Sequence, residues 1–179
     1  MSPHLPDFVD PWHFADIGKR ISGSFALESL PRLAPLLMEP HGEAVFELAF
    51  SRDERKRARL EGQIQAVLTL QCQRCLGPVS LPVEMKFSLV AVHGIEEAGQ
   101  LPDSVDPLLI GESKMRLVEL VEDELLLSLP QVPRHEAGEC SAAVIEKPDW
   151  DSADAKEKGE PAPNPFAQLA NLKTNRNTD

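Results

Sequence analysis

The fold is decided by the segment Leu68-Thr69-Leu70-Gln71-Cys72-Gln73-Arg74-Cys75-Leu76-Gly77-Pro78-Val79-Ser80-Leu81, where two alternating patterns meet at a short turn. Before the turn, apolar residues occupy the even positions from Leu60 to Cys72, and most odd positions are polar. After it, apolar residues occupy the odd positions from Val79 to Ala91. A period of two is typical of strands with one buried face, so this segment predicts two antiparallel strands joined by a tight hairpin. Gly77 is able to take the positive φ that such a turn requires.

The residues before this hairpin extend it into a meander. Alternation predicts a short strand over 20–27 and a longer one over 44–50. Between them, residues 28–38 carry leucines at helical spacing, but Pro31 and Pro35 limit the prediction to one short helix. At least three antiparallel strands then follow one another, with a basic tip at one end and the thiol tip at the other.

Residues 115–129 are predicted to form the main helix. Apolar residues recur there at spacings of three and four, and Pro130 ends the pattern. Its acidic residues are assigned to the solvent side: Glu119, Glu122, Asp123 and Glu124. A second interpretation makes them a surface that holds a basic protein. The predicted fold class is α+β, an antiparallel β meander packed against one main helix, within a domain spanning residues 1–135.

The chain changes character after residue 135. Residues 136–165 hold eight acidic and three basic residues and few large apolar side chains, which predicts a disordered acidic linker over 136–163. Residues 164–179 begin with Asn164 as a helix cap and Pro165 at the first helical position. This predicts a short C-terminal helix, marginal alone, that folds on this protein or on a partner. Its partner-binding side is formed by Phe166, Leu169 and Leu172.

Length and composition favour one ordinary domain with additional segments. The chain has 179 residues, of which 42% are hydrophobic. No stretch approaches the roughly 18 consecutive apolar residues of a membrane helix, and the N-terminus lacks the features of a signal peptide, so we expect a soluble, cytoplasmic protein with no membrane partner. Three cysteines, an odd number, argue for free thiols or metal ligands and against a disulfide framework.

Charge is distributed unevenly along the chain. The net charge is −11, yet residues 52–59 hold five of the 18 basic residues and a local charge of +3, which leaves −14 for the remainder. Such a run is either a solvated hairpin tip or a finger that contacts RNA phosphates. With no tyrosine and 5% aromatic residues, base stacking would be minor. The candidate rRNA-binding residues are Arg52, Arg55, Lys56, Arg57, Arg59 and Arg74.

The cysteines offer three interpretations. With His135 and Cys140 they can form a Cys₃His metal site, for which Zn²⁺ is the candidate ion: Cys72, Cys75, His135 and Cys140. They can instead be small buried residues and free thiols, or a redox pair. The redox interpretation lacks the helix N-terminus that lowers the thiol pKa in thioredoxin-type motifs. We find no nucleophile motif or glycine-rich phosphate loop, and we therefore expect no enzymatic activity.

Four motifs carry a family resemblance. They are Cys72-Gln73-Arg74-Cys75-Leu76, Val121-Glu122-Asp123-Glu124-Leu125-Leu126-Leu127-Ser128-Leu129-Pro130, Val132-Pro133-Arg134-His135 followed by Cys140, and Asn164-Pro165-Phe166-Ala167-Gln168-Leu169-Ala170-Asn171-Leu172-Lys173. In this order and with similar separations, they resemble the YceD-like large ribosomal RNA subunit accumulation proteins, over residues 44–173. Some relatives complete a four-cysteine site with a second Cys-x-x-Cys motif. This chain has only Cys140 in that region, so His135 is the required substitute.

The resemblance implies a bacterial protein type, shared with plastids, that supports synthesis, processing or stability of large-subunit (23S) ribosomal RNA without an assigned catalytic step. The leading hypothesis is a ribosome-biogenesis factor that binds the precursor large subunit through a basic ribosomal or assembly protein, and through rRNA directly at the basic tip. The alternative is a zinc- or redox-responsive regulatory protein that uses Cys72 and Cys75.

Overall fold

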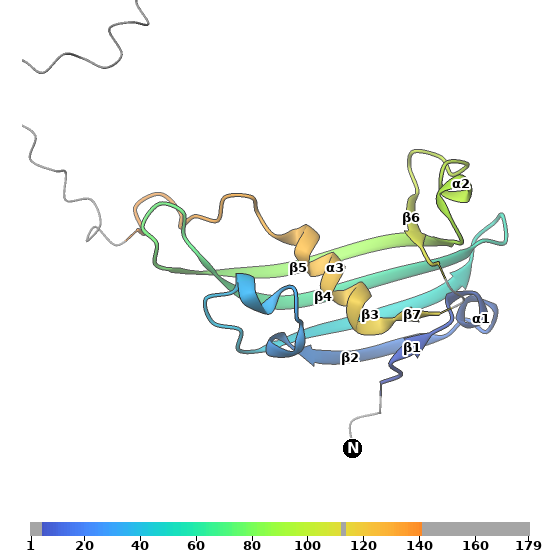
Figure 1. Ribbon diagram of the computed structural model, residues 1–179, viewed down its shortest axis with the longest axis horizontal. Helices are drawn as coiled ribbons and strands as arrows, with labels where there is room; N and C mark the ends of the chain where they lie inside the picture. Colours follow the sequence, from blue (N-terminus) through green and yellow to red (C-terminus); the bar gives the residue numbers. More distant parts are fainter. Residues whose placement is uncertain (1–4, 112–113, 141–179) are drawn as a thin grey trace, which may run out of the picture. The chain divides into compact units, whose positions relative to one another are not determined.

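A five-stranded sheet dominates the computed structural model, which describes residues 5–111 and 114–140. The strand order is β2-β3-β4-β5-β6, and the first four strands are antiparallel neighbours (Figure 1). β6 pairs in parallel with the last residues of β5. The strands are β2 (Arg20–Ala26), β3 (Glu43–Arg52), β4 (Ala58–Gln71), β5 (Pro78–Val92) and β6 (Asp106–Leu109). The predicted α+β class and the antiparallel meander are confirmed.

The remaining described elements are short, except for one helix. They are β1 (Phe8–Val9), which pairs with β7 (Met115–Arg116), α1 (Pro11–Asp16), the 3₁₀ turns η1 (Leu27–Ser29) and η2 (Ala34–Leu36), α2 (Ile95–Ala98) and α3 (Leu117–Ser128). α3 is the predicted main helix. The sequence interpretation missed α1, although Asp10 caps it by accepting the backbone N–H of His13 at 3.0 Å and Pro11 occupies its first turn.

The prediction of one short helix over 28–38 is wrong. Two separate 3₁₀ turns, η1 and η2, occupy this segment. Proline has no N–H to donate and its ring crowds the preceding turn, so Pro31 and Pro35 prevent a continuous helix. Leu36 is 53% exposed, but four other leucines of this region are buried in the core cluster: Leu27, Leu30, Leu33 and Leu37.

The core lies between one face of the sheet and the elements that cover it. Figure 1 shows α3 lying across the middle of the sheet, and the apolar side chains of α3 belong to the same buried cluster as those of β3 and β4. Gly62 on β4 faces Phe87 on β5, and a Cβ at residue 62 would come within 2.1 Å of the Phe87 ring. The ring therefore covers the glycine on the core side. Among the described residues, no helix is long and apolar enough to cross a bilayer.

Two carboxylates assigned to the wet side of α3 are buried. Glu122 is only 1% exposed and Glu124 only 8% exposed, which corrects the sequence interpretation, whereas Glu119 and Asp123 are exposed. Burial, together with the nearby Asp123 and Asp106, raises the pKa of Glu124. The helical pattern failed here because it records spacing only and takes no account of a partner distant in the sequence.

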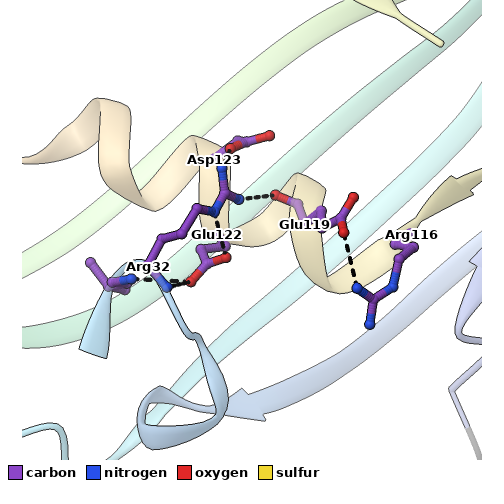
Figure 2. A network of polar contacts seen from close by, with 6 residues as sticks. Arg32, Arg116, Glu119, Glu122 and Asp123 are labelled. Atoms are coloured by element: carbon purple, nitrogen blue, oxygen red, sulfur yellow. Dashed lines mark hydrogen bonds and ion pairs between the residues drawn. The ribbon is translucent and has the colours of Figure 1, made fainter. Parts of the chain in front are cut away.

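The partner of Glu122 is the segment between η1 and η2 (Figure 2). The Glu122 carboxylate accepts the backbone N–H groups of Arg32 at 2.7 Å and Leu33 at 3.1 Å, and the Arg32 Nε at 2.9 Å. The Arg32 guanidinium also bonds Asp123 and the Glu119 carbonyl. Burial alone would raise the pKa of Glu122, but these hydrogen bonds and the Arg32 charge lower it. The buried Glu122 carboxylate thus links α3 to the segment between η1 and η2.

We predict that Glu122→Gln lowers the free energy of unfolding at pH 7 by about 1–3 kcal/mol, because it removes a charged acceptor from buried donors. A carboxyl with a lowered folded-state pKa stabilises the fold above its ordinary pKa of 4.5, and that contribution is lost as pH falls below it. The difference between wild type and variant should therefore shrink below about pH 4.5. Urea denaturation at a series of pH values measures this.

Glu119→Gln is the matched control, because the Glu119 side chain is 54% exposed and, among the described residues, pairs only with the exposed Arg116 side chain. It should change stability by no more than about 0.5 kcal/mol. Equal effects of the two substitutions, or a Glu122→Gln effect that is constant across pH, would contradict the assigned role of Glu122.

Candidate metal centre

The turn between β4 and β5 presents its two cysteines inward. The backbone N–H of Cys72 donates to the Gly77 carbonyl and that of Leu76 donates to the Cys72 carbonyl, both at 2.9 Å, so the turn closes on itself. Leu76 takes the left-handed conformation, with φ of 61°, and Gly77 does not, which corrects the expectation for Gly77. Both cysteines are buried, although they lie at a hairpin tip. The tip is therefore covered by another part of the chain.

That cover is the segment that follows α3. Figure 1 shows this segment reaching the β4–β5 turn, and the Gln73 N–H donates to the Pro133 carbonyl at 2.9 Å. His135 and Cys140 consequently lie beside the two buried thiols. The structure thus brings together the four residues proposed from the sequence, although 59 residues separate Cys75 from His135 in the chain. Cys140, assigned to the linker by composition, packs against the domain.

Three of the six distances among the four ligand atoms match the edges of a tetrahedral site. The four atoms lie within 4.8 Å of one another. Cys72 Sγ and Cys140 Sγ are 3.7 Å apart, and His135 Nδ1 lies 3.4 Å from Cys75 Sγ and 3.6 Å from Cys140 Sγ. A tetrahedron with Zn–S bonds of about 2.3 Å and a Zn–N bond of about 2.05 Å has S···S edges of about 3.8 Å and S···N edges of about 3.6 Å. The donor set and its dimensions fit one tetrahedral ion.

The His135 ring is oriented for coordination through Nδ1. Its Nε2 lies 2.8 Å from the Pro78 carbonyl oxygen. A carbonyl oxygen can accept a hydrogen bond but cannot donate one, so Nε2 carries the proton. Nδ1 then faces the three sulfurs. A carbonyl that holds the distal N–H of a histidine in this way is the usual second-shell partner of a metal ligand.

The electrostatics of the pocket favour a thiolate. Burial would raise the pKa of Cys72, but hydrogen bonds from the backbone N–H groups of Cys75, His135 and Arg74 lower it to about 5. Hydrogen bonding to Cys72 raises the pKa of His135, and the Pro78 carbonyl adds to the effect. Cys140 differs, because burial raises its pKa despite the nearby Arg74. Metal ligation requires thiolates, so Cys72 is better prepared to bind a metal than Cys140.

Arg74, which the sequence predicts as an rRNA contact, lies beside this cluster in the structure. Its Nε donates to Cys140 Sγ at 2.8 Å, and its Nη2 donates to the carbonyls of His135 at 3.3 Å and Glu136 at 3.0 Å. One guanidinium therefore holds a sulfur and two backbone carbonyls of the covering segment. The sequence contained a hint of this role, because Arg74 lies between the two cysteines.

The basic tip lies at the other end of β4. Asp53 organises the turn from β3 by accepting the N–H groups of Arg55 at 2.9 Å and Arg57 at 2.8 Å, and it pairs with the Arg57 guanidinium at 2.6 Å. Arg52 pairs with Asp16 at 2.7 Å, and Arg59 pairs with Glu61 at 3.0 Å. Among the described residues, no carboxylate pairs with Arg55 or Lys56, and both are exposed. The free positive charge of the tip is thus smaller than its sequence suggests.

Comparison with known proteins gives one family. The model of the family described as "Large ribosomal RNA subunit accumulation protein YceD" matches residues 60–173. A protein of that name from Haemophilus influenzae is 34% identical over 172 residues, which cover 94% of this chain and 96% of the relative. The chain belongs to the YceD family. No solved structure matches it.

Membership confirms the resemblance stated from the four motifs and gives the chain a role in large ribosomal subunit RNA accumulation. The matched residues include both cysteines of the β4–β5 turn, His135 and Cys140. The predicted partner-binding residues of the C-terminal segment, Phe166, Leu169 and Leu172, lie outside the described residues. The YceD family name refers to an accumulation factor and not to a reaction.

We predict that Arg74→Gln weakens metal binding by about 10- to 100-fold, the usual cost of losing a second-shell contact, while the four ligands remain. The affinity is measured by competition between the full chain and a chromophoric chelator for Co²⁺, whose absorption bands also report tetrahedral thiolate coordination. Arg134→Gln is the control, because Arg134 is exposed and adjoins His135. Equal affinities of the two variants would contradict the role of Arg74.

Proposed function

We propose that this chain is a non-enzymatic binding factor that supports the synthesis, processing or stability of large-subunit (23S) rRNA. The observation that carries the proposal is YceD family membership over nearly the whole chain. Its partner is the precursor large ribosomal subunit, which it engages chiefly through a basic ribosomal or assembly protein. This role belongs in the cytoplasm, where ribosomes assemble.

The preference for a protein partner comes from charge. A chain of net charge −11 repels phosphates over most of its surface and attracts basic proteins. The proposed direct rRNA contact is confined to the basic tip, where Arg55 and Lys56 point to solvent without a carboxylate partner among the described residues. In this proposal Arg52, Arg57 and Arg59 shape the tip through their ion pairs and contribute less free charge. The C-terminal residues Phe166, Leu169 and Leu172 remain a second proposed contact to the partner.

We predict that the double variant Arg55→Glu, Lys56→Glu lowers co-sedimentation of the chain with precursor large subunits by about tenfold, because it replaces two free positive charges with negative ones. Gradient sedimentation of lysates at two salt concentrations, followed by blotting for the chain, measures this. Lys114→Glu, Arg134→Glu is the control, since it changes the net charge equally at other exposed positions. If both double variants sediment like wild type, the tip makes no contact with rRNA.

We further propose that Zn²⁺ occupies the Cys72, Cys75, His135 and Cys140 site. When bound, the ion would supply a structural cross-link between the β4–β5 turn and the segment after α3. The chain's own residues support this role by presenting three sulfurs and Nδ1 at tetrahedral spacing. Four protein ligands fill a tetrahedral ion and leave no open position, which favours a structural over a catalytic ion.

The full chain purified without chelator should contain about one zinc per molecule, and Cys72→Ser should contain none. Removing the metal with a strong chelator should lower the melting temperature, because ligand binding to the folded state stabilises it. Elemental analysis and thermal denaturation measure the two effects. His41→Ala is the control, since His41 is exposed and lies outside the ligand set. Metal-free protein with fully reduced thiols would rule out the zinc proposal.

A second function is favoured by the same cluster. Cys72 Sγ and Cys140 Sγ are 3.7 Å apart, so after loss of the ion a peroxide would oxidise the two thiols to a disulfide by taking up two electrons and two protons and being reduced to water. This pair differs from the Cys72 and Cys75 pair proposed from the sequence. The chain would then be a zinc- or redox-responsive regulatory protein. Large-subunit rRNA levels that follow zinc supply in wild type, but not in Cys72→Ser cells, would favour this function. Wild-type levels that do not change with zinc supply would favour a purely structural ion.

A further inference from the structure

The outer face of the sheet, opposite the buried cluster, is left open over β3, β4 and most of β5 by the described residues, whereas Val90 and Val92 at the end of β5 are buried. β3 and β4 are central strands, yet their side chains on this face are exposed or half-buried. The covering elements contribute to the buried cluster on the opposite face. A central strand normally exposes polar side chains on an uncovered face, so an apolar side chain here requires an explanation.

Two valines occupy this face. Val45 on β3 is 50% exposed and Val67 on β4 is 58% exposed. Val45 faces Gln65, two residues from Val67, and Val67 faces Pro82 on β5. An apolar diagonal therefore crosses three strands. Beside it lies a hollow of about 620 Å³ lined by Glu43, Gln65, Ala66, Val67, Pro82, Val83 and Glu84.

Carboxylates flank this apolar diagonal. The lining of the hollow includes Glu43 and Glu84 and no lysine or arginine. Glu84 accepts a hydrogen bond from Gln63 at 3.4 Å, and no described cation pairs with Glu43. The neighbouring hollow, of about 580 Å³, is more balanced, because Arg20 and Lys86 accompany Glu47 and Glu61 there. The excess negative charge therefore gathers at the Val67 end of the face.

We propose that the outer face of β3, β4 and β5 around Val67 docks a protein segment rich in lysine and arginine. Its apolar side chains would cover Val45, Val67 and Pro82, while its cations would pair with Glu43 and Glu84. This proposal rests on the proposed function and names the surface that receives the basic protein partner.

Other occupants fit the surface less well. RNA would bring phosphates against the carboxylates, and the described strands present no aromatic side chain on this face for a base to stack on. A second copy of the chain would bring the same acidic end toward its own glutamates. Of these three occupants, only the basic segment would both cover the apolar diagonal and supply cations to the carboxylates.

The test is photo-crosslinking in cells with the full-length chain. Val67→p-benzoylphenylalanine places the crosslinker on the proposed surface, and Leu109→p-benzoylphenylalanine is the matched control, because Leu109 is 56% exposed on β6. Mass spectrometry then maps the crosslinked peptide. The expected product is a peptide of another protein with net positive charge, formed at Val67 and not at Leu109.

Charge reversal provides the second arm. Adding Glu43→Lys and Glu84→Lys should lower the yield of that product by about tenfold, because two attractions become repulsions. Circular dichroism of the variant checks that it folds. RNA as the product, a product from this chain itself, the same product at Leu109, or a yield unaffected by charge reversal would each overturn the proposal.

Failure of this surface is distinguishable from failure of the proposed function. The distinguishing measurement is the level of large-subunit rRNA in cells of the same strain from which the chain has been deleted. If rRNA falls but Val67 yields no specific basic peptide, the surface is wrong and the function stands. If rRNA is unchanged while Val67 yields the charge-dependent product, the docking surface stands and the function is wrong.

Discussion

The pairing of β4 with β5 is the constraint on which the rest of the structure depends. Their register runs from Arg59 opposite Val90 to Gln71 opposite Pro78, and the core side of this long hairpin supplies much of the buried cluster. A slip of one residue would turn every apolar side chain to solvent, so the register is strongly specified. Because β4 has 14 residues, it separates the basic turn from the thiol turn by about 45 Å. At that distance, substitutions at the two ends should act independently.

Local patterns predicted what short stretches of sequence determine. The strand alternation, the thiol turn and the helix ended by Pro130 follow from spacing and turn chemistry, and the structure has all three. His135 and Cys140 were proposed from the sequence as the further ligands beside Cys72 and Cys75, and the fold brings the four residues together. The remaining features depend on contacts distant in sequence. The residues around Glu122 in the sequence do not predict its burial, because its partner, the backbone of Arg32, lies 90 residues earlier in the chain.

The same limit explains the misassigned charges. In the sequence, the cations of residues 52–59 appear to be unpaired. In the structure, Arg52, Arg57 and Arg59 each form an ion pair with a carboxylate, and the partner of Arg52 lies on α1. Likewise Glu122 appears solvated in the sequence, whereas the structure buries it against Arg32. Local charge counts therefore overstate the contrast between a positive tip and a negative body. Among the residues that the structure describes, Arg55 and Lys56 at the tip have no carboxylate partner, and Glu43 and Glu84 gather on the outer face of the sheet.

Charge balance in the proposed zinc site would also account for an arginine at residue 74. Three thiolates and a neutral imidazole around a divalent ion would carry a net charge of −1, which is costly where two of the sulfurs are buried. The Arg74 guanidinium would offset this charge, because its Nε donates to Cys140 Sγ while its Nη2 donates to two carbonyls of the covering segment. A lysine supplies the same charge from a single atom and has no planar fork to span a sulfur and a carbonyl. Arg74 therefore couples the charge of the site to the position of the segment that closes it, which connects the β4–β5 turn to the chain beyond α3.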